Sequence, residues 1–166
     1  AIQQVIQIKS SELLVKLADE SRNLASEIQR NPDFRDAVDR ADQTVVSSHL
    51  NEQFHRYFNT AGVIRLRKLY VLDRHYRRLA ESSSQLGGGG LGEVCAAMLE
   101  QAQHRSGAHH LKSISSLCAA KNTALFATLA PIGSLQLHGF IMVITEPSQD
   151  LGAIGRELGM PVRIVP

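Results

Sequence analysis

Histidines supply the sequence's most obvious candidates for metal binding. Three of its seven histidines, His104, His109 and His110, fall in "HRSGAHH", and His138 lies in a later apolar stretch. Imidazole nitrogens suit borderline metal ions. This spacing is typical of a helix end and loop rather than of two ligands on one helical face, and no nearby acidic residue completes a site. We expect a solvated helix end, where the helix dipole favours a histidine, and no metal or other cofactor.

The two cysteines are the only thiols that could react or crosslink. Cys95 and Cys118 form neither a paired metal motif nor a redox CxxC motif. Nothing beside them suggests an oxyanion hole or an orienting acid, so we expect no nucleophilic enzyme and no catalytic residues. In a reducing compartment both would be core thiols, whereas an oxidising compartment would favour a disulfide.

Composition limits the class of protein. The 166 residues are 43% apolar and 20% charged, as in one ordinary globular domain. A formal net charge of +2 gives no support for a nucleic-acid surface. No run approaches the roughly 18 to 20 apolar residues of a membrane helix, and no signal peptide is visible. The chain begins inside an amphipathic pattern without an initiator Met, and we expect it to be part of a longer protein.

Residues 1–62 have a helical pattern. Apolar residues recur at three- and four-residue spacings, which predicts one long helix over residues 1–30. These residues are Leu13, Leu14, Leu17, Leu24 and Ile28, with Ile2, Val5 and Ile6 upstream. Pro32 should end this helix and begin the next segment. One or two shorter helices are expected over residues 33–60, with Gly62 as their cap.

Residues 63–166 have a different pattern and should form one sheet-based folding unit. Two strands, "VIRLRKLYVLD" and "YRRLAES", precede a Gly-rich loop and the helix "GEVCAAMLEQAQHRS". Three strands follow over residues 111–120, 123–133 and 135–147, and then a last helix and the strand "PVRIVP". The sequence thus predicts an α+β fold: a long N-terminal helix and helical segment, then a PAS-like five- to six-stranded antiparallel sheet with a crossover helix.

This order of elements resembles the single-Cache family of bacterial sensor domains. The residues that carry the resemblance are "LASEIQRNPDFRDAV", "LYVLDRHYRRLAESS" and "LFATLAPIGSLQLHGFIMVITEP". The resemblance implies a ligand-sensing domain in the periplasm, placed between two membrane helices of an inner-membrane signal transduction protein. Such receptors control a chemoreceptor coil, a histidine kinase or a cyclic-dinucleotide enzyme. The family's amine- and carboxylate-binding signatures are not recognisable here, so the ligand is not implied.

Two further expectations follow from that placement. Outside the cytoplasm, Cys95 and Cys118 should form a disulfide that joins the crossover helix to the third strand. Ile2, Val5 and Ile6 should pair with a second copy of the long helix, because a small sheet covers only its later turns. The alternative function is a dimerisation or structural domain of such a receptor that needs no ligand.

A pocket in this layout would lie between the sheet and the segments that cover it. Candidate ligand-binding residues are Arg67, Tyr70, Lys112, Ser116, Thr128 and Gly139. Tyr70 is either a buried ring with a backbone partner or a ligand contact. Arg67 is expected to be exposed, but turned inward it could hold a carboxylate. If Gly139 faces the concave side of the sheet, it would leave room for a ligand beside Tyr70 and the crossover helix, and the alternative is a bulge or close packing of that helix.

Overall fold

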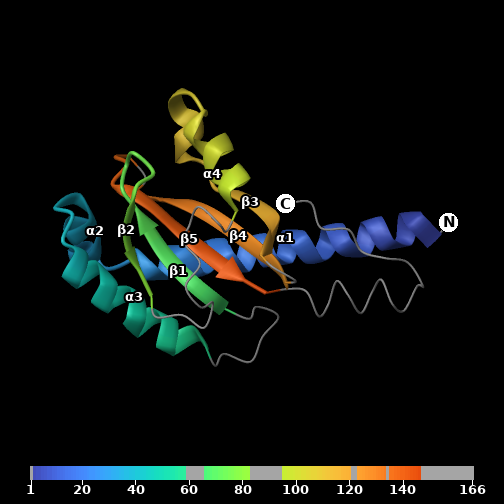
Figure 1. Ribbon diagram of the computed structural model, residues 1–166, viewed down its shortest axis with the longest axis horizontal. Helices are drawn as coiled ribbons and strands as arrows, with labels where there is room; N and C mark the ends of the chain where they lie inside the picture. The colour runs from blue at the N-terminus through green and yellow to red at the C-terminus, as the bar shows by residue number, and fades with distance from the viewer. Residues whose placement is uncertain (1, 59–65, 83–94, 121–122, 134, 147–166) are drawn as a thin grey trace.

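The computed structural model describes residues 2–58, 66–82, 95–120, 123–133 and 135–146 (Figure 1). Four α-helices, one 3-10 helix and five strands lie in these ranges. In chain order they are α1 (Ile2–Ile28), α2 (Pro32–Asp39), α3 (Gln43–Phe58), β1 (Leu66–Leu72), β2 (Arg78–Glu81), α4 (Ala96–Gln103), the 3-10 helix η1 (Gly107–Leu111), β3 (Ile114–Ala120), β4 (Thr123–Ile132) and β5 (Gly139–Thr145). The α+β fold class predicted from the sequence is confirmed.

The helix break predicted at Pro32 is present, and its chemistry is local. Asn31 caps α2, since its side-chain oxygen accepts a hydrogen bond of 2.9 Å from the Asp33 backbone N–H. Pro32 occupies the first turn, where its missing N–H is not needed. Phe34 and Val38 on α2 are then buried against the sheet.

The five strands form one antiparallel sheet in the order β2-β1-β5-β4-β3. The last strand in the chain, β5, therefore lies at the centre, and β2 and β3 lie at opposite edges. Between these two edges the chain has to cross the sheet, and α4 belongs to this crossing (Figure 1). This is the crossover helix expected from the sequence.

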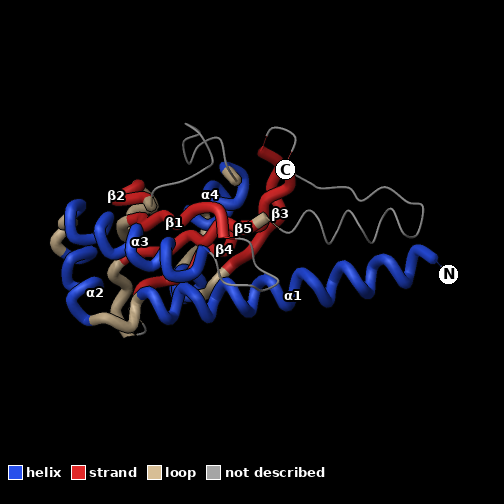
Figure 2. The backbone as a smooth tube through the Cα atoms, turned by 90° about the horizontal axis from the view of Figure 1, so that it is seen from below, coloured by secondary structure: helices blue, strands red, loops and turns tan. Residues whose placement is uncertain are grey.

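Alternation along the strands gives the sheet two apolar faces, because successive side chains point to opposite sides. On β5, Ile141 and Val143 join a core cluster with α1, α2 and α3, which we call the helical face. Phe140 and Met142 join a second cluster with α4, which we call the α4 face. Figure 2 shows α1 and α4 on opposite sides of the strands.

The N-terminal turns of α1 extend beyond the described strands in both views (Figures 1 and 2). Among its described side chains, burial begins at Leu17 and continues through Ile28. The helix lies against β4 and β5. Within the described part of the chain, no helix has the length and apolar character needed to cross a membrane.

Two strand starts differ from the sequence prediction. The third strand begins at Ile114 rather than at residue 111, because residues 107–111 form η1. The fifth begins at Gly139 rather than at residue 135, because Gly133, with φ of 100°, turns the chain and the His138 N–H donates to the Ile132 carbonyl. The last helix, the terminal strand and the Gly62 cap lie outside the described residues.

Asp73 organises the turn between β1 and β2. Its carboxylate accepts backbone N–H groups from His75 at 2.8 Å and Arg77 at 3.0 Å, and pairs with the Arg77 side chain at 3.2 Å. Burial alone would raise the pKa of Asp73, but these hydrogen bonds and the Arg77 charge together lower it. The ionised carboxylate is therefore the form that the folded protein favours.

We expect Asp73→Ala to lower the free energy of unfolding by about 1 to 2 kcal/mol, because the two backbone donors lose a charged acceptor. Since the pKa is depressed on folding, this stability is present above the unfolded value of about 3.9 and is lost as the pH falls through the lower folded value. Urea unfolding from neutral pH to about pH 2 should show the two proteins converging only below about pH 4. Arg74→Ala is the control. Arg74 is exposed, so its replacement should leave the free energy of unfolding as in wild type at every pH.

Candidate functional site

The α4 face carries a group of polar side chains near its β2 edge. Lys68 and Tyr70 are two residues apart on β1 and point to the same side. Glu81 of β2 is the registered partner of Tyr70 and lies beside them. The Lys68 ammonium lies 3.7 Å from the Glu81 carboxylate and 5.5 Å from the centre of the Tyr70 ring. We call Lys68, Tyr70 and Glu81 the polar triad.

Burial decides the electrostatics of the polar triad. Tyr70 is 1% exposed and Lys68 is 8% exposed. Burial lowers the pKa of Lys68, and the Glu81 carboxylate offsets only part of that effect. Burial and the Glu81 charge both raise the pKa of Tyr70, so its phenol stays protonated. Lys68 and Tyr70 therefore present hydrogen-bond donors in buried surroundings.

The Tyr70 hydroxyl has no hydrogen-bond partner among the described residues, although it is fully buried. Leaving a buried donor unpaired costs about 1 to 3 kcal/mol. A buried hydroxyl without a partner therefore calls for an explanation, such as a bound ligand or water. Of the two interpretations of Tyr70 from the sequence, the ring is buried as expected, but the described residues supply no backbone partner.

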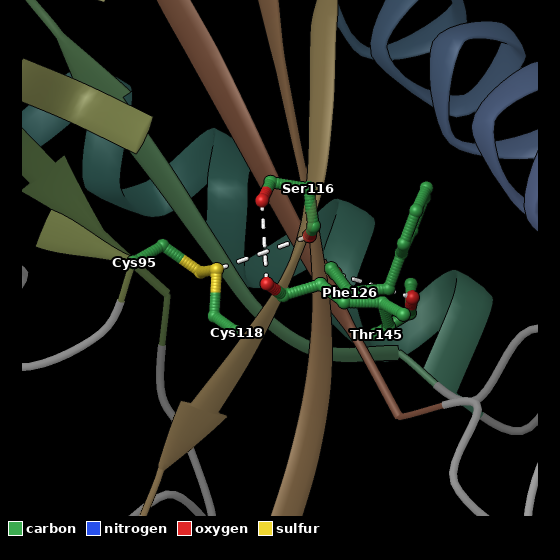
Figure 3. Close-up of a disulfide and its surroundings, with 6 residues drawn as sticks. Cys95, Ser116, Cys118, Phe126 and Thr145 are labelled. Atoms are coloured by element: carbon green, nitrogen blue, oxygen red, sulfur yellow. Dashed lines mark hydrogen bonds between the residues drawn. A yellow bond between two sulfur atoms is a disulfide. The ribbon is translucent and has the colours of Figure 1, made fainter. Parts of the chain in front are cut away.

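A disulfide fixes the start of the crossing segment. Cys95 immediately precedes α4 and is joined to Cys118 of β3, with 5.3 Å between the two Cα atoms (Figure 3). This is the bond that the sequence resemblance implied. The Cys118 sulfur also lies 3.8 Å from the Ser116 carbonyl oxygen. Both cysteines are buried in the cluster of the α4 face.

A hydrogen-bonded cluster holds the other end of the crossing segment. Tyr76, in the β1–β2 turn, stacks on Phe140 with 4.4 Å between ring centres. Its hydroxyl lies 2.6 Å from the Nδ1 atom of His110 on η1 and accepts a hydrogen bond of 3.3 Å from Arg105. Arg105 also donates to the Lys112 carbonyl at 2.8 Å. Side chains far apart in the sequence thus meet at one end of the α4 face.

Three of the sequence-predicted residues have their own partners or lie apart from the triad. Arg67 sits in a β-bulge, and its Nε pairs with Glu146 at 3.1 Å. Ser116 lies on the α4 face near the opposite edge and donates to the Leu117 carbonyl. Lys112 is exposed after η1. Whether any of them binds a ligand stays a prediction.

Two of the predicted residues lie on the other side of the sheet. Thr128 is completely buried on the helical side, where its hydroxyl lies 2.8 Å from that of Ser115. Gly139 is also on that side, and a Cβ placed there would lie 3.1 Å from Val38 of α2 and 2.4 Å from the Leu72 carbonyl oxygen. Gly139 therefore does not face Tyr70, and it packs closely, against α2 and β1 rather than against the crossover helix.

The histidines have separate local partners. The ring of His104 bonds to the Glu100 carbonyl at 2.7 Å, and His138 pairs with Asp39 of α2 at 2.6 Å. Among the described residues, no three His, Cys, Asp or Glu side chains gather as metal ligands would.

A separate surface depression of about 420 Å³ lies at the C-terminal end of α1. It is lined by Ser26, Gln29, Arg30, Arg35 and Gly133. Gln29 is committed to structure, because its amide bonds both the Pro131 carbonyl and the Gly133 N–H at 2.9 Å. None of the residues predicted from the sequence lines this depression.

Two solved structures share the architecture described above. The sensor domain of the V. cholerae histidine kinase DctB matches 92% of this chain with a TM-score of 0.54 and 10% sequence identity. The extracellular domain of vpHK1S-Z8, described as a histidine kinase, matches 93% with a TM-score of 0.51 and 8% identity. This chain corresponds to 57% and 60% of the length of those two chains. No protein-family model and no curated protein matches the sequence.

The chain thus has a PAS-like fold that is also found in histidine-kinase sensor domains. The resemblance inferred from the sequence is confirmed at the level of the fold. At 8% and 10% identity, the likeness does not transfer a ligand or a signalling output.

Lys68 and Glu81, the two charged members of the polar triad, were not among the residues predicted from the sequence. A strand repeats every two residues, so Lys68 and not Arg67 shares a face with Tyr70. That signal was present in "LRKLYVL". Glu81 could not be found in the same way, because its position opposite Tyr70 depends on a register shift between Val71 and Leu72.

Proposed function

We propose that this chain is the extracytoplasmic ligand-sensing domain of a bacterial membrane-bound signal transduction protein. The observation that carries the proposal is the unpaired, buried Tyr70 hydroxyl beside the buried Lys68 ammonium, on the face of the sheet that the α4 crossing covers. The shared fold with two histidine-kinase sensor domains supports it. A disulfide is typical of proteins outside the reducing cytoplasm and agrees with that placement.

The polar triad indicates the kind of ligand. Tyr70 and Lys68 offer hydrogen-bond donors, and the Lys68 charge is only partly balanced because Glu81 is 3.7 Å away and 43% exposed. A small organic molecule with an acceptor group, such as a carboxylate or a carbonyl oxygen, would satisfy both donors. It would enter as a noncovalent ligand, and the domain would signal without catalysis.

The long helix would connect this domain to the rest of the receptor. In the proposed arrangement α1 follows one membrane helix, a second membrane helix comes after the sheet domain, and the first turns of α1 pair with a second copy. The extension of those turns beyond the described strands supports this. The kind of output module, whether chemoreceptor coil, kinase or cyclic-dinucleotide enzyme, belongs to the remainder of the protein.

Thermal unfolding against a panel of small carboxylates, amides and sugars tests ligand binding. A ligand at a hundred times its dissociation constant adds about 2.7 kcal/mol, which raises the melting temperature by roughly 5 to 10 °C at this size. The expected result is such a shift with a subset of the panel. A receptor domain that dimerises without a ligand would show no shift with any compound.

Tyr70→Phe separates binding from folding. Removing the unpaired hydroxyl should leave the unliganded protein as stable as wild type or up to about 1 kcal/mol more stable, while the ligand-induced shift falls by at least half. Tyr57→Phe is a matched control, because Tyr57 is a partly buried tyrosine on the helical face. A ligand shift that survives Tyr70→Phe unchanged would place the site elsewhere.

A further inference from the structure

We propose that the segment from Cys95 to Leu111 is a lid on the α4 face, hinged at the disulfide and latched by the contact between Tyr76 and His110. The proposal rests on the proposed function, since it describes how a ligand would reach the polar triad. Its evidence is the attachment of the segment: the disulfide and the short link from Leu111 to Ile114 join its two ends to β3, and hydrogen bonds join it to the β1–β2 turn.

The hinge is a single covalent point. Cys95 has φ of 58°, a left-handed conformation that a non-glycine residue seldom adopts, and α4 starts at the next residue. The disulfide fixes this residue to β3. No side chain caps the start of α4, so the disulfide is its main described attachment there.

Between Cys95 and His110, few side chains of the segment are buried against the rest of the domain. Three side chains of α4 are buried, namely Met98, Leu99 and Ala102. The 3-10 helix η1 buries none of its residues. In Figure 1, α4 and the segment after it rise away from the strands. η1 also lies against β4 and leads into β3, and the latch is what joins it to the β1–β2 turn.

The latch is a directed chain of hydrogen bonds. Arg105 donates to the Tyr76 oxygen, which leaves the phenol proton free to be donated to Nδ1 of His110 at 2.6 Å. Tyr76 is held by its stacking on Phe140 of β5, and it too has a left-handed backbone, with φ of 64°. The latch thus joins the lid to the centre of the sheet.

Hydrogen exchange of the oxidised chain without ligand tests the lid. In Tyr76→Phe, the amides of His109 and Lys112, which bond within the η1 turn, should exchange at least about tenfold faster, while β5 exchanges at the wild-type rate. His109→Ala removes an exposed neighbouring imidazole and should change neither. Wild-type rates in Tyr76→Phe, or equal acceleration of β5, would overturn the proposal.

Reduction of the disulfide tests the hinge separately from the latch. Exchange in α4 should become faster, because α4 loses its anchor, and unchanged exchange in α4 would contradict the hinge. Because no ligand is present, these results stand or fall separately from ligand binding.

Discussion

Gly139→Leu should lower the free energy of unfolding by about 3 kcal/mol or more, because the added side chain has no space on the helical side of the sheet. Its Cβ would lie 2.4 Å from the Leu72 carbonyl oxygen of the neighbouring strand and 3.1 Å from Val38 of α2. The first contact is with backbone in the centre of a paired sheet, which cannot shift without disturbing β1 and β5. Urea unfolding of the purified variant measures the loss.

Ala97→Leu is the control for this substitution. It adds a similar side chain on the exposed side of α4 and should change stability by no more than about 0.5 kcal/mol. Gly139→Ala should be destabilised in the same direction, but by less than Gly139→Leu. Wild-type stability in Gly139→Leu would mean that this position opens into space, and it would restore Gly139 as a candidate for lining a pocket.

Removing the disulfide should cost about 3 kcal/mol, because the bond closes a loop of 23 residues that the unfolded chain would otherwise leave open. For a domain of this size that corresponds to a fall in melting temperature of roughly 6 to 12 °C. The double variant Cys95→Ser and Cys118→Ser, compared with oxidised wild type by calorimetry, measures it.

A reductant provides the control for this prediction. The melting temperature of the double variant should not respond to a reductant, whereas that of wild type should fall toward it. If wild type melts at the same temperature with and without reductant, and two thiols can be titrated in the untreated native protein, the bond does not form in solution.

Much of the architecture follows from local patterns in the sequence. Apolar spacing and Pro32 predict α1 and the start of α2, and the change of pattern from residue 63 predicts the strands. The helix expected before the third strand is present as α4. Each of these signals arises within one element, so no knowledge of distant contacts is needed.

The faces of the strands were harder to assign. Tyr70 and Ser116 do lie on the α4 face, but Thr128 and Gly139 lie on the other side, because each is offset by one residue from the positions that point toward α4. A one-residue change reverses the direction of a side chain. Bulges in β1 further disturb the alternation that the sequence suggests.

The latch could not be predicted from the sequence. Tyr76 and His110 are 34 residues apart and meet only because the chain crosses from one edge of the sheet to the other. His138 and Asp39, about a hundred residues apart, likewise meet only in the folded chain. Contacts of this kind are decided by the tertiary fold.

The projecting end of α1 acts geometrically as a lever. Among its described side chains burial begins at Leu17, and about 22 Å of helix lies on the N-terminal side of that residue at 1.5 Å per residue. A tilt of about 5° around that point would move the first turn by about 2 Å, a displacement similar to helix shifts that switch other proteins. A small change at the packed end of α1 would thus be magnified at its far end.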